Sequence, residues 1–200
     1  MSVPNAKNRI IGLTGGIATG KSTASDYLKK KGYAVLDSDQ IVADLWKHNQ
    51  QMLNKIMHVF NITSINKIKE QVKEIAFQDK EQLKKLDEII HPYVFKAIKA
   101  QINTLENEKY IFIDMPLLFE VGYQTQCDET WLIYVPQSLQ IKRLMKRDHM
   151  KIEQAIKRIG FQMDIEQKKM LADHLLENRK NVRRLYHQID ILLEEYKHEK

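Results

Sequence analysis

The stretch at residues 10–23 constrains the fold of this 200-residue chain more than any other part of its sequence. An apolar run at residues 10–13 predicts a strand, and residues 22–31 are compatible with a helix. The loop between them has the spacing G-x-x-x-x-G-K-[ST], and its four fixed positions are Gly15, Gly20, Lys21 and Ser22. The order strand, glycine-rich loop, helix predicts an α/β fold with a phosphate-binding loop.

Each residue type in this loop has a physical reason. Glycines allow a tight turn that aims backbone N–H groups inward, and the helix N-terminus adds positive potential for a polyphosphate. We expect Lys21 to be exposed toward the outer phosphates and Ser22 to hold Mg²⁺. The alternative is a flexible turn in which Lys21 is a solvated charge. The phosphate contacts are expected from the whole loop: Gly15, Gly16, Ile17, Ala18, Thr19, Gly20, Lys21, Ser22 and Thr23.

Length and composition fit a single domain with insertions, without a bilayer-spanning run or a signal peptide, and they predict a cytoplasmic protein. The one cysteine, Cys127, excludes an intrachain disulfide and is expected to be a packed thiol. The formal charge of +6 comes mostly from the C-terminal third. Nucleic acid is one candidate partner, but the basic residues alternate with acids and lack a binding motif, so small phosphate-rich ligands are favoured.

Carboxylates follow two further predicted strands. Asp37 and Asp39 come after residues 33–36, and Asp114 comes after residues 110–113. Ligands collect at the carboxyl ends of parallel strands, which predicts that Asp37 and Asp39 lie beside the glycine-rich loop. Asp114 stands where a P-loop protein places the carboxylate that organises Mg²⁺ and its waters. The alternatives are helix capping, by Asp39 or Ser38, and a loop cap by Asp114.

The rest of the chain divides into helical and mixed parts. Residues 40–105 read as successive amphipathic helices, interrupted at His91-Pro92, where a new helix is expected to begin. His91 is either a helix-start residue or a substrate contact. Arg143, Arg147 and Arg158 lie on two helices that suit a mobile lid, where guanidinium groups neutralise developing phosphate charge. The alternative for some of these arginines is a surface pair with Asp148 or Glu153.

The order and spacing of motifs resemble the dephospho-coenzyme A kinase family nearly end to end. The matching segments are Gly12 to Ile17, Gly20 to Thr23, Asp37-Ser38-Asp39, Ile90-His91-Pro92, Pro116 to Glu120, Gln140, Arg143-Leu144, Arg147-Asp148, Arg158, Gln162, Ala172-Asp173 and Asn178. The resemblance implies a three-layer α/β/α P-loop kinase, like the nucleoside monophosphate kinases, with a parallel sheet. The core is expected at residues 1–39, 106–146 and 172–200, the coenzyme A region at 40–105 and the lid at 147–171.

The resemblance also implies roles. Asp39 is the expected base for the ribose 3′-hydroxyl of dephospho-coenzyme A, and Lys21 and Arg143 complete the catalytic set. Arg143 and Arg158 are expected to clamp ATP, with Asn178 near adenine. Ser22, and Asp114 through water, are expected to serve Mg²⁺. The expected substrate contacts are Asp39, His91, Pro116, Leu117 and Leu118. ATP and dephospho-coenzyme A are the expected partners of a monomer without nucleic acid or membrane.

The chain departs from the family pattern at a few places: Ser38 replaces alanine, Lys69 replaces arginine, the loop at 61–66 is short and lacks glycine, and no glycine follows Asn178. Lysine cannot form the bidentate fork that arginine makes with phosphate. Another small-metabolite or nucleoside monophosphate kinase is the alternative enzyme, although a phosphate acceptor needs no base. A nucleotide-switch protein of GTPase type is the alternative class, but the N-K-x-D segment is missing.

Overall fold

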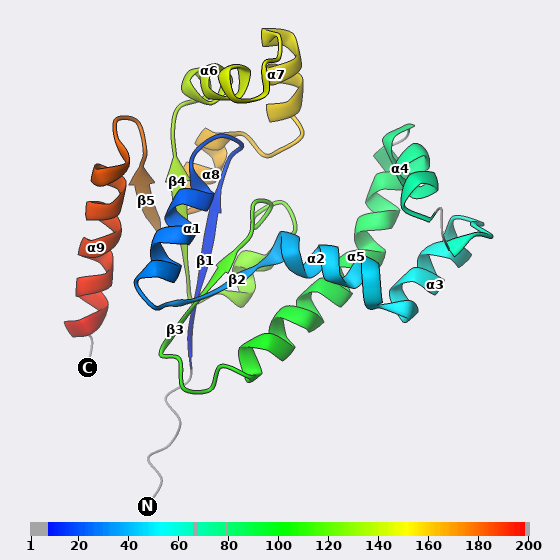
Figure 1. Ribbon diagram of the computed structural model, residues 1–200, viewed down its shortest axis with the longest axis horizontal. Coiled ribbons are helices and arrows are strands. Elements are labelled where there is room, and N and C mark those ends of the chain that lie inside the picture. Colours follow the sequence, from blue (N-terminus) through cyan, green and yellow to red (C-terminus); the bar gives the residue numbers. More distant parts are fainter. Residues whose placement is uncertain (1–7, 66–67, 79, 199–200) are drawn as a thin grey trace, which may run out of the picture. The chain divides into compact units, whose positions relative to one another are not determined.

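The computed structural model describes residues 8–65, 68–78 and 80–198 and divides the chain into two compact units. The first unit combines residues up to 36 with those from 105 onward, and the second comprises residues 37–104. The first unit contains a five-stranded sheet, and the second is built from helices (Figure 1). The predicted α/β class is confirmed.

The glycine-rich loop follows the central strand of the sheet. The strand order is β2 (Ala34–Asp37), β3 (Tyr110–Asp114), β1 (Arg9–Gly15), β4 (Glu129–Tyr134) and β5 (His174–Glu177). The pairings of β1 with β3, β1 with β4, and β4 with β5 are parallel. The strands β1, β3 and β4 are buried almost throughout, and each contains an apolar run, as expected for strands covered on both faces.

Helices cover the sheet and supply its core. Helices α1 (Lys21–Lys30) and α9 (Val182–His198) pack on one face, where Phe112 and Trp131 join their apolar side chains. Ile165 of α8 (Ile165–Leu171) packs against Leu132 and Tyr134 of β4. The other described elements of the first unit are α6 (Gln137–Asp148), α7 (Ile152–Ile159) and the 3₁₀ helix η2 (Tyr123–Gln126).

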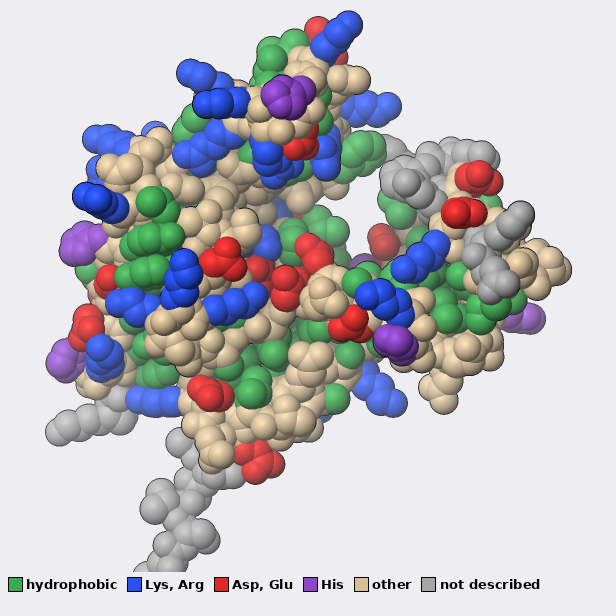
Figure 2. Space-filling view, viewed as in Figure 1, with side chains coloured by type: hydrophobic (Ala, Val, Ile, Leu, Met, Phe, Trp, Pro, Cys, Tyr) green, Lys and Arg blue, Asp and Glu red, His purple; other side chains and the backbone are tan. Residues whose placement is uncertain are grey.

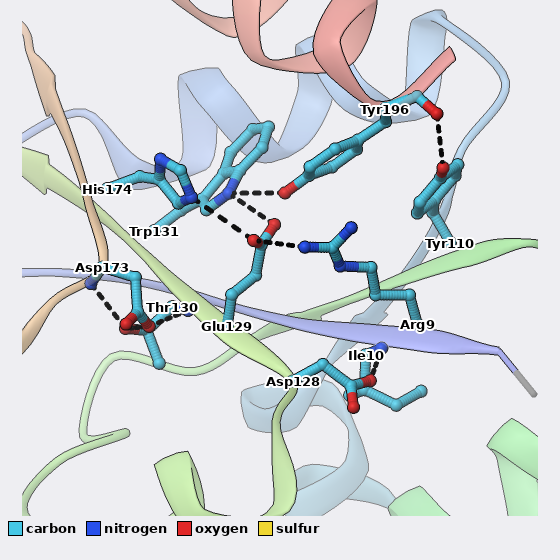
Figure 3. A network of polar contacts seen from close by, with 10 residues as sticks. All are labelled: Arg9, Ile10, Tyr110, Asp128, Glu129, Thr130, Trp131, Asp173, His174 and Tyr196. Carbon is cyan, nitrogen blue, oxygen red and sulfur yellow. Dashed lines mark hydrogen bonds and ion pairs between the residues drawn. The ribbon is translucent and has the colours of Figure 1, made fainter. Parts of the chain in front are cut away.

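A polar network fixes the opposite end of the sheet, where the parallel strands begin (Figure 3). Glu129 is buried, and its Oε2 accepts from Arg9 at 3.1 Å and lies 3.3 Å from His174 Nε2. Trp131 Nε1 donates to Glu129 Oε1 at 3.2 Å and to the Tyr196 hydroxyl at 3.0 Å. A buried charge needs several partners, and the network supplies them to the Glu129 carboxylate. In doing so it links β1, β4, β5 and α9.

The second unit contains α2 (Ser38–His48), α3 (Gln50–Val59), α4 (Ile68–Gln78) and α5 (Lys80–Asn103). The prediction that a new helix begins at His91-Pro92 is wrong, because α5 continues through Pro92 without a break. Proline removes one backbone donor, but Ile89, Ile90 and Val94 around it are buried, and their packing holds the helix in one piece. None of the described helices is long and apolar enough to cross a bilayer.

Candidate functional site

The glycine-rich loop is a closed turn held by its own backbone. Thr19 donates to the Gly16 carbonyl through both its N–H, at 3.2 Å, and its hydroxyl, at 2.8 Å. Gly20 has φ +94°, a left-handed conformation that side chains rarely adopt, and α1 begins at the next residue. The turn thus delivers Lys21, Ser22 and the first N–H groups of α1 to the carboxyl end of β1, where helix N-termini bind anions.

Three polar side chains from elsewhere in the first unit hold this loop. Gln140 Nε2 donates to the Ile17 carbonyl at 2.8 Å, and Gln162 Oε1 accepts from the Ile17 N–H at 2.8 Å. Asn178 Nδ2 donates to the Thr19 carbonyl at 2.8 Å. A Cβ atom on Gly16 would lie 2.3 Å from Gln140 Nε2, so the approach of Gln140 requires glycine there. The loop is held in one conformation before any ligand contact is considered.

Arg143 is the arginine that reaches the loop. Its guanidinium donates to the Asn178 carbonyl at 2.7 Å and lies 3.4 and 3.5 Å from the carbonyls of Ala18 and Thr19. Asn178 is buried and follows β5, so its side chain lies against the loop rather than at an exposed base-binding position. Arg143 and Asn178 are therefore brought together with the loop.

Lys21 is paired rather than exposed. Its ammonium forms an ion pair with Asp114 Oδ1, and only 16% of the Lys21 side chain is accessible. The expectation of an exposed lysine is wrong, because Asp114 at the end of β3 lies beside β1 in the sheet and attracts the ammonium, whereas the contact of Lys21 with phosphate stays a prediction. The ammonium has three N–H donors, so one pair leaves others for phosphate oxygens.

The helices after β4 carry many cations, and Figure 2 shows Lys and Arg side chains gathered over α6 and α7. Arg147 and Arg158 both pair with Asp148, each at 2.6 Å. Their hydrogen bonds, that of Arg147 foremost, hold the pKa of Asp148 below its usual range. The structure thus places Arg158 on Asp148, apart from the loop contacts of Arg143. Ile17 and Ala18 of the loop pack against the apolar cluster of these helices, formed by Leu144, Ala155 and Ile159.

Residues 116–120 form a loop that follows β3 and mixes buried and exposed positions. The Leu118 side chain is fully buried, whereas Leu117 is 40% exposed. The Pro116 carbonyl accepts from the Thr14 hydroxyl at 3.2 Å and from Lys168 Nζ at 2.8 Å. Leu118 therefore contributes to the core, and Leu117 is the apolar side chain of this loop that faces solvent.

Two of the expected acceptor-side residues, Asp39 and His91, lie in the second unit, whereas Pro116, Leu117 and Leu118 lie in the first. Asp37, not Asp39 or Ser38, caps α2, and its carboxylate accepts from the N–H groups of Asp39 and Gln40 at 2.9 and 3.1 Å. Asp39 therefore stands in the first turn of α2, exposed. His91 stacks on Phe95 with ring centroids 6.0 Å apart.

The predicted metal ligands are a hydroxyl and a carboxylate. Ser22 is exposed at the start of α1, and Asp114 is buried with one oxygen paired to Lys21. Among the described residues no group of three or more His, Cys, Asp or Glu could hold a metal alone. A sparse set of oxygen donors fits Mg²⁺, which keeps several waters and binds through one or two protein groups plus substrate phosphates.

Two other residues deserve comparison with the sequence. The pKa of the Cys127 thiol is raised to about 12 by burial, which agrees with a packed thiol. Lys168 was missed altogether: it is fully buried in α8 and pairs with Glu120 at 2.8 Å. A lysine three residues after the buried Ile165 shares its helix face, but that spacing is too common among lysines to predict burial.

Comparisons with known proteins indicate the family of this chain. The family model described as dephospho-CoA kinase matches residues 9–184. The dephospho-CoA kinase of Carboxydothermus hydrogenoformans is 37% identical over 194 residues, covering 94% of each chain. The dephospho-CoA kinase structure from Campylobacter jejuni has a TM-score of 0.69 at 29% identity, covering 94% of this chain and 96% of its own. A Thermus thermophilus crystal structure reaches 0.79 at 30% identity, covering 94% and 97%.

Proposed function

Because this chain belongs to the dephospho-CoA kinase family, we propose that its two units divide the reaction between the phosphoryl donor and the acceptor. The chain catalyses the ATP-dependent phosphorylation of dephospho-CoA, the step that yields coenzyme A. The donor side is assigned to the glycine-rich loop with its neighbours, and the acceptor side to residues 40–105 together with Asp39 and the loop at Pro116, Leu117 and Leu118. Residues 147–171 are assigned to a lid over ATP.

The donor assignment is supported above all by the fixed conformation of the glycine-rich loop. Its turn aims N–H groups and the N-terminus of α1 toward one place, and Lys21 and Arg143 add two cations there. Phosphoryl transfer depends mainly on positioning and on neutralising the charge of the γ-phosphoryl group. Lys21 shares its donors between Asp114 and the outer phosphates, and Arg143 acts at the loop. Arg158 would have to leave Asp148 to take part.

Mg²⁺ is the proposed metal, bound with ATP. Ser22 and Asp114 would hold it, Asp114 through water, and the ion would neutralise phosphate charge. Asp114 Oδ1 pairs with Lys21, and a carboxylate has a second oxygen that can accept from a metal-bound water. Ser22 is exposed at the start of α1, which suits a ligand shared with a phosphate.

On the acceptor side, we assign Asp39 as the base that receives the proton of the ribose 3′-hydroxyl. This assignment is supported by its exposure and by the capping of α2, which Asp37 performs instead. His91 and the loop at Pro116, Leu117 and Leu118 are the further proposed contacts for dephospho-CoA; the buried Leu118 would act through the shape of its loop.

Asp39→Asn tests this division. Initial rates of ADP release are measured against dephospho-CoA, with Asp44→Asn on the same helix as the matched exposed control. A general base contributes about 10² to 10⁴-fold, and the loose transition state of phosphoryl transfer places the expected loss of kcat in the lower half of that range. ATP binding should be unchanged. A near parental rate would leave Asp39 without a role in proton transfer.

A panel of acceptors distinguishes the related kinases. The parent enzyme is assayed with dephospho-CoA, nucleoside monophosphates and simple metabolite alcohols under the same conditions. We expect turnover with dephospho-CoA, because a base suits a hydroxyl acceptor, whereas a phosphate acceptor needs none. Preference for a nucleoside monophosphate would favour the alternative kinase.

A further inference from the structure

Lys168 is a buried cation to which the proposed reaction assigns no role. Its side chain has no exposed surface, and Nζ donates to Glu120 Oε1 and to the Pro116 carbonyl, both at 2.8 Å. Burial lowers the pKa of Lys168, and the contact with Glu120 opposes that shift. Lysine is almost never fully buried unless it is paired, since removing an ammonium from water is costly. Because burying this ammonium is costly, packing alone does not explain why α8 has a lysine at this position.

Glu120 depends in turn on its ion pair with Lys168. Glu120 Oε1 accepts from Lys168 and, at 2.9 Å, from the Met163 N–H. Its Oε2 is buried and has no hydrogen-bond partner among the described residues. Lys21 is the other charged group felt by Lys168, and its repulsion contributes to the lowered pKa. The Lys168 ammonium is thus the one cation paired with Glu120 in the described part of the chain.

The two contacts of Lys168 lead to two points of the glycine-rich loop, its start and its middle. At the start, the Pro116 carbonyl also accepts from the hydroxyl of Thr14, the residue immediately before Gly15. Toward the middle, Glu120 holds the backbone of Met163, which directly follows Gln162. Gln162 in turn binds the Ile17 N–H in the middle of the loop.

These contacts close into a ring that runs through the backbone of residues 14–17, and Lys168 is the side chain that joins its two arms. We propose that Lys168, paired with Glu120, is a positioning residue for phosphoryl transfer, acting through Gln162 on the glycine-rich loop. This inference rests on the proposed binding of the ATP phosphates at that loop. Without the pair, Gln162 loses its fixed backbone, and the Ile17 amide and its neighbours shift relative to the phosphates.

The test compares variants that separate charge burial from positioning. Lys168→Met alone leaves Glu120 buried without a cation and is prone to unfold. The informative variant is therefore Lys168→Met combined with Glu120→Gln, which removes both charges and nearly preserves volume. Lys169→Met is the matched control, because Lys169 is the adjacent lysine of α8 and is 41% exposed. Gln162→Ala is made in the parent and in the neutral-pair variant.

The readouts are the dissociation constant of Mg·ATP by calorimetry, and kcat with both KM values. We expect the neutral-pair variant to remain folded, with kcat/KM for ATP lowered about 10 to 100-fold, because a displacement of about 1 Å at a reacting group can cost 10²-fold. The ATP dissociation constant should rise in parallel. Because Lys168 acts through Gln162, adding Gln162→Ala to the neutral pair should lower kcat/KM less than twofold further.

Several results would overturn the inference. Parental kcat/KM and ATP binding in a folded neutral-pair variant would do so, as would effects of the pair and of Gln162 that multiply independently. A lower kcat with both KM values and ATP binding unchanged would also overturn it, because that result indicates only a smaller active fraction. A parent that binds ATP without phosphorylating dephospho-CoA refutes the proposed function instead, and ATP binding by the variants still tests the ring.

Discussion

Replacing Lys21 with methionine should lower the stability of the protein as well as its activity. Asp114 is 3% exposed, and its ion pair with Lys21 is the contact that the substitution removes. Removing one partner of a buried ion pair costs about 3 to 5 kcal/mol, because the remaining charge stays buried. Since 16% of the Lys21 side chain is accessible, water can partly replace it, and we take the lower end, about 3 kcal/mol.

The expected loss can be measured in the first unit alone. Trp131 is buried in the sheet, whereas Trp46 lies in the second unit, so the Trp46→Phe background leaves Trp131 as the single fluorescent probe. With a urea m-value of about 2 kcal/mol/M, a loss of 3 kcal/mol lowers the unfolding midpoint by about 1.5 M. Lys29→Met, an exposed position of α1, should leave the midpoint unchanged.

The double variant Lys21→Met with Asp114→Asn separates stability from activity. It removes both charges, so most of the lost stability should return, short by about 1 kcal/mol for the missing hydrogen bond. Turnover should remain absent in both variants, because neither supplies a cation to the outer phosphates. The reasoning is refuted if the single variant unfolds at the parental midpoint, or if the double variant is no more stable than the single one.

Two further predictions concern Cys127, which precedes β4, and Gly16 of the glycine-rich loop. The pKa of Cys127 is raised to about 12, so between pH 9 and 12 the folded protein keeps a proton that the unfolded chain releases, and stability falls as pH rises. Between pH 8 and 10 this fall should be about 1.4 kcal/mol in urea titrations and should vanish in Cys127→Ala; an equal fall in both proteins would contradict it. Gly16→Ala places a Cβ 2.3 Å from Gln140 Nε2 and should raise KM for ATP about tenfold, whereas Gly160→Ala meets only ordinary contacts and should not. Equal KM values in the two glycine variants would show that the approach of Gln140 is dispensable.

The sequence was sufficient for the parts of the fold that local patterns encode. The strand, loop and helix at residues 10–31 follow from apolar runs and glycines, and β3 and β4 each contain an apolar run. The helix break expected at Pro92 is not present, because proline acts on a helix locally, whereas the burial of Ile89, Ile90 and Val94 comes from tertiary packing. Propensity is a weak prior that such packing overrides.

Polar contacts between distant segments were harder to predict. The pairing of Lys21 with Asp114 depends on the register of β1 and β3, in which Leu13 lies beside Asp114. The sequence of either strand alone does not predict that register. Lys168 was missed for a related reason: its burial depends on Glu120, which lies 48 positions earlier in the printed sequence. Periodicity identifies helix faces, but not which charged side chain will find a partner.

The division into two units makes the donor and acceptor residues separable in kinetic terms. Lys21, Arg143 and the residues that hold the loop belong to the first unit, while Asp39 and His91 belong to the second. A group that binds ATP equally in the ground and transition states affects KM for ATP, whereas a base that acts only during transfer affects kcat. The side-chain amides of Gln162 and Asn178 bind the loop backbone, so their loss should appear in the parameters of ATP. Asp39 should instead change kcat without changing ATP affinity, because it has no assigned contact with the donor.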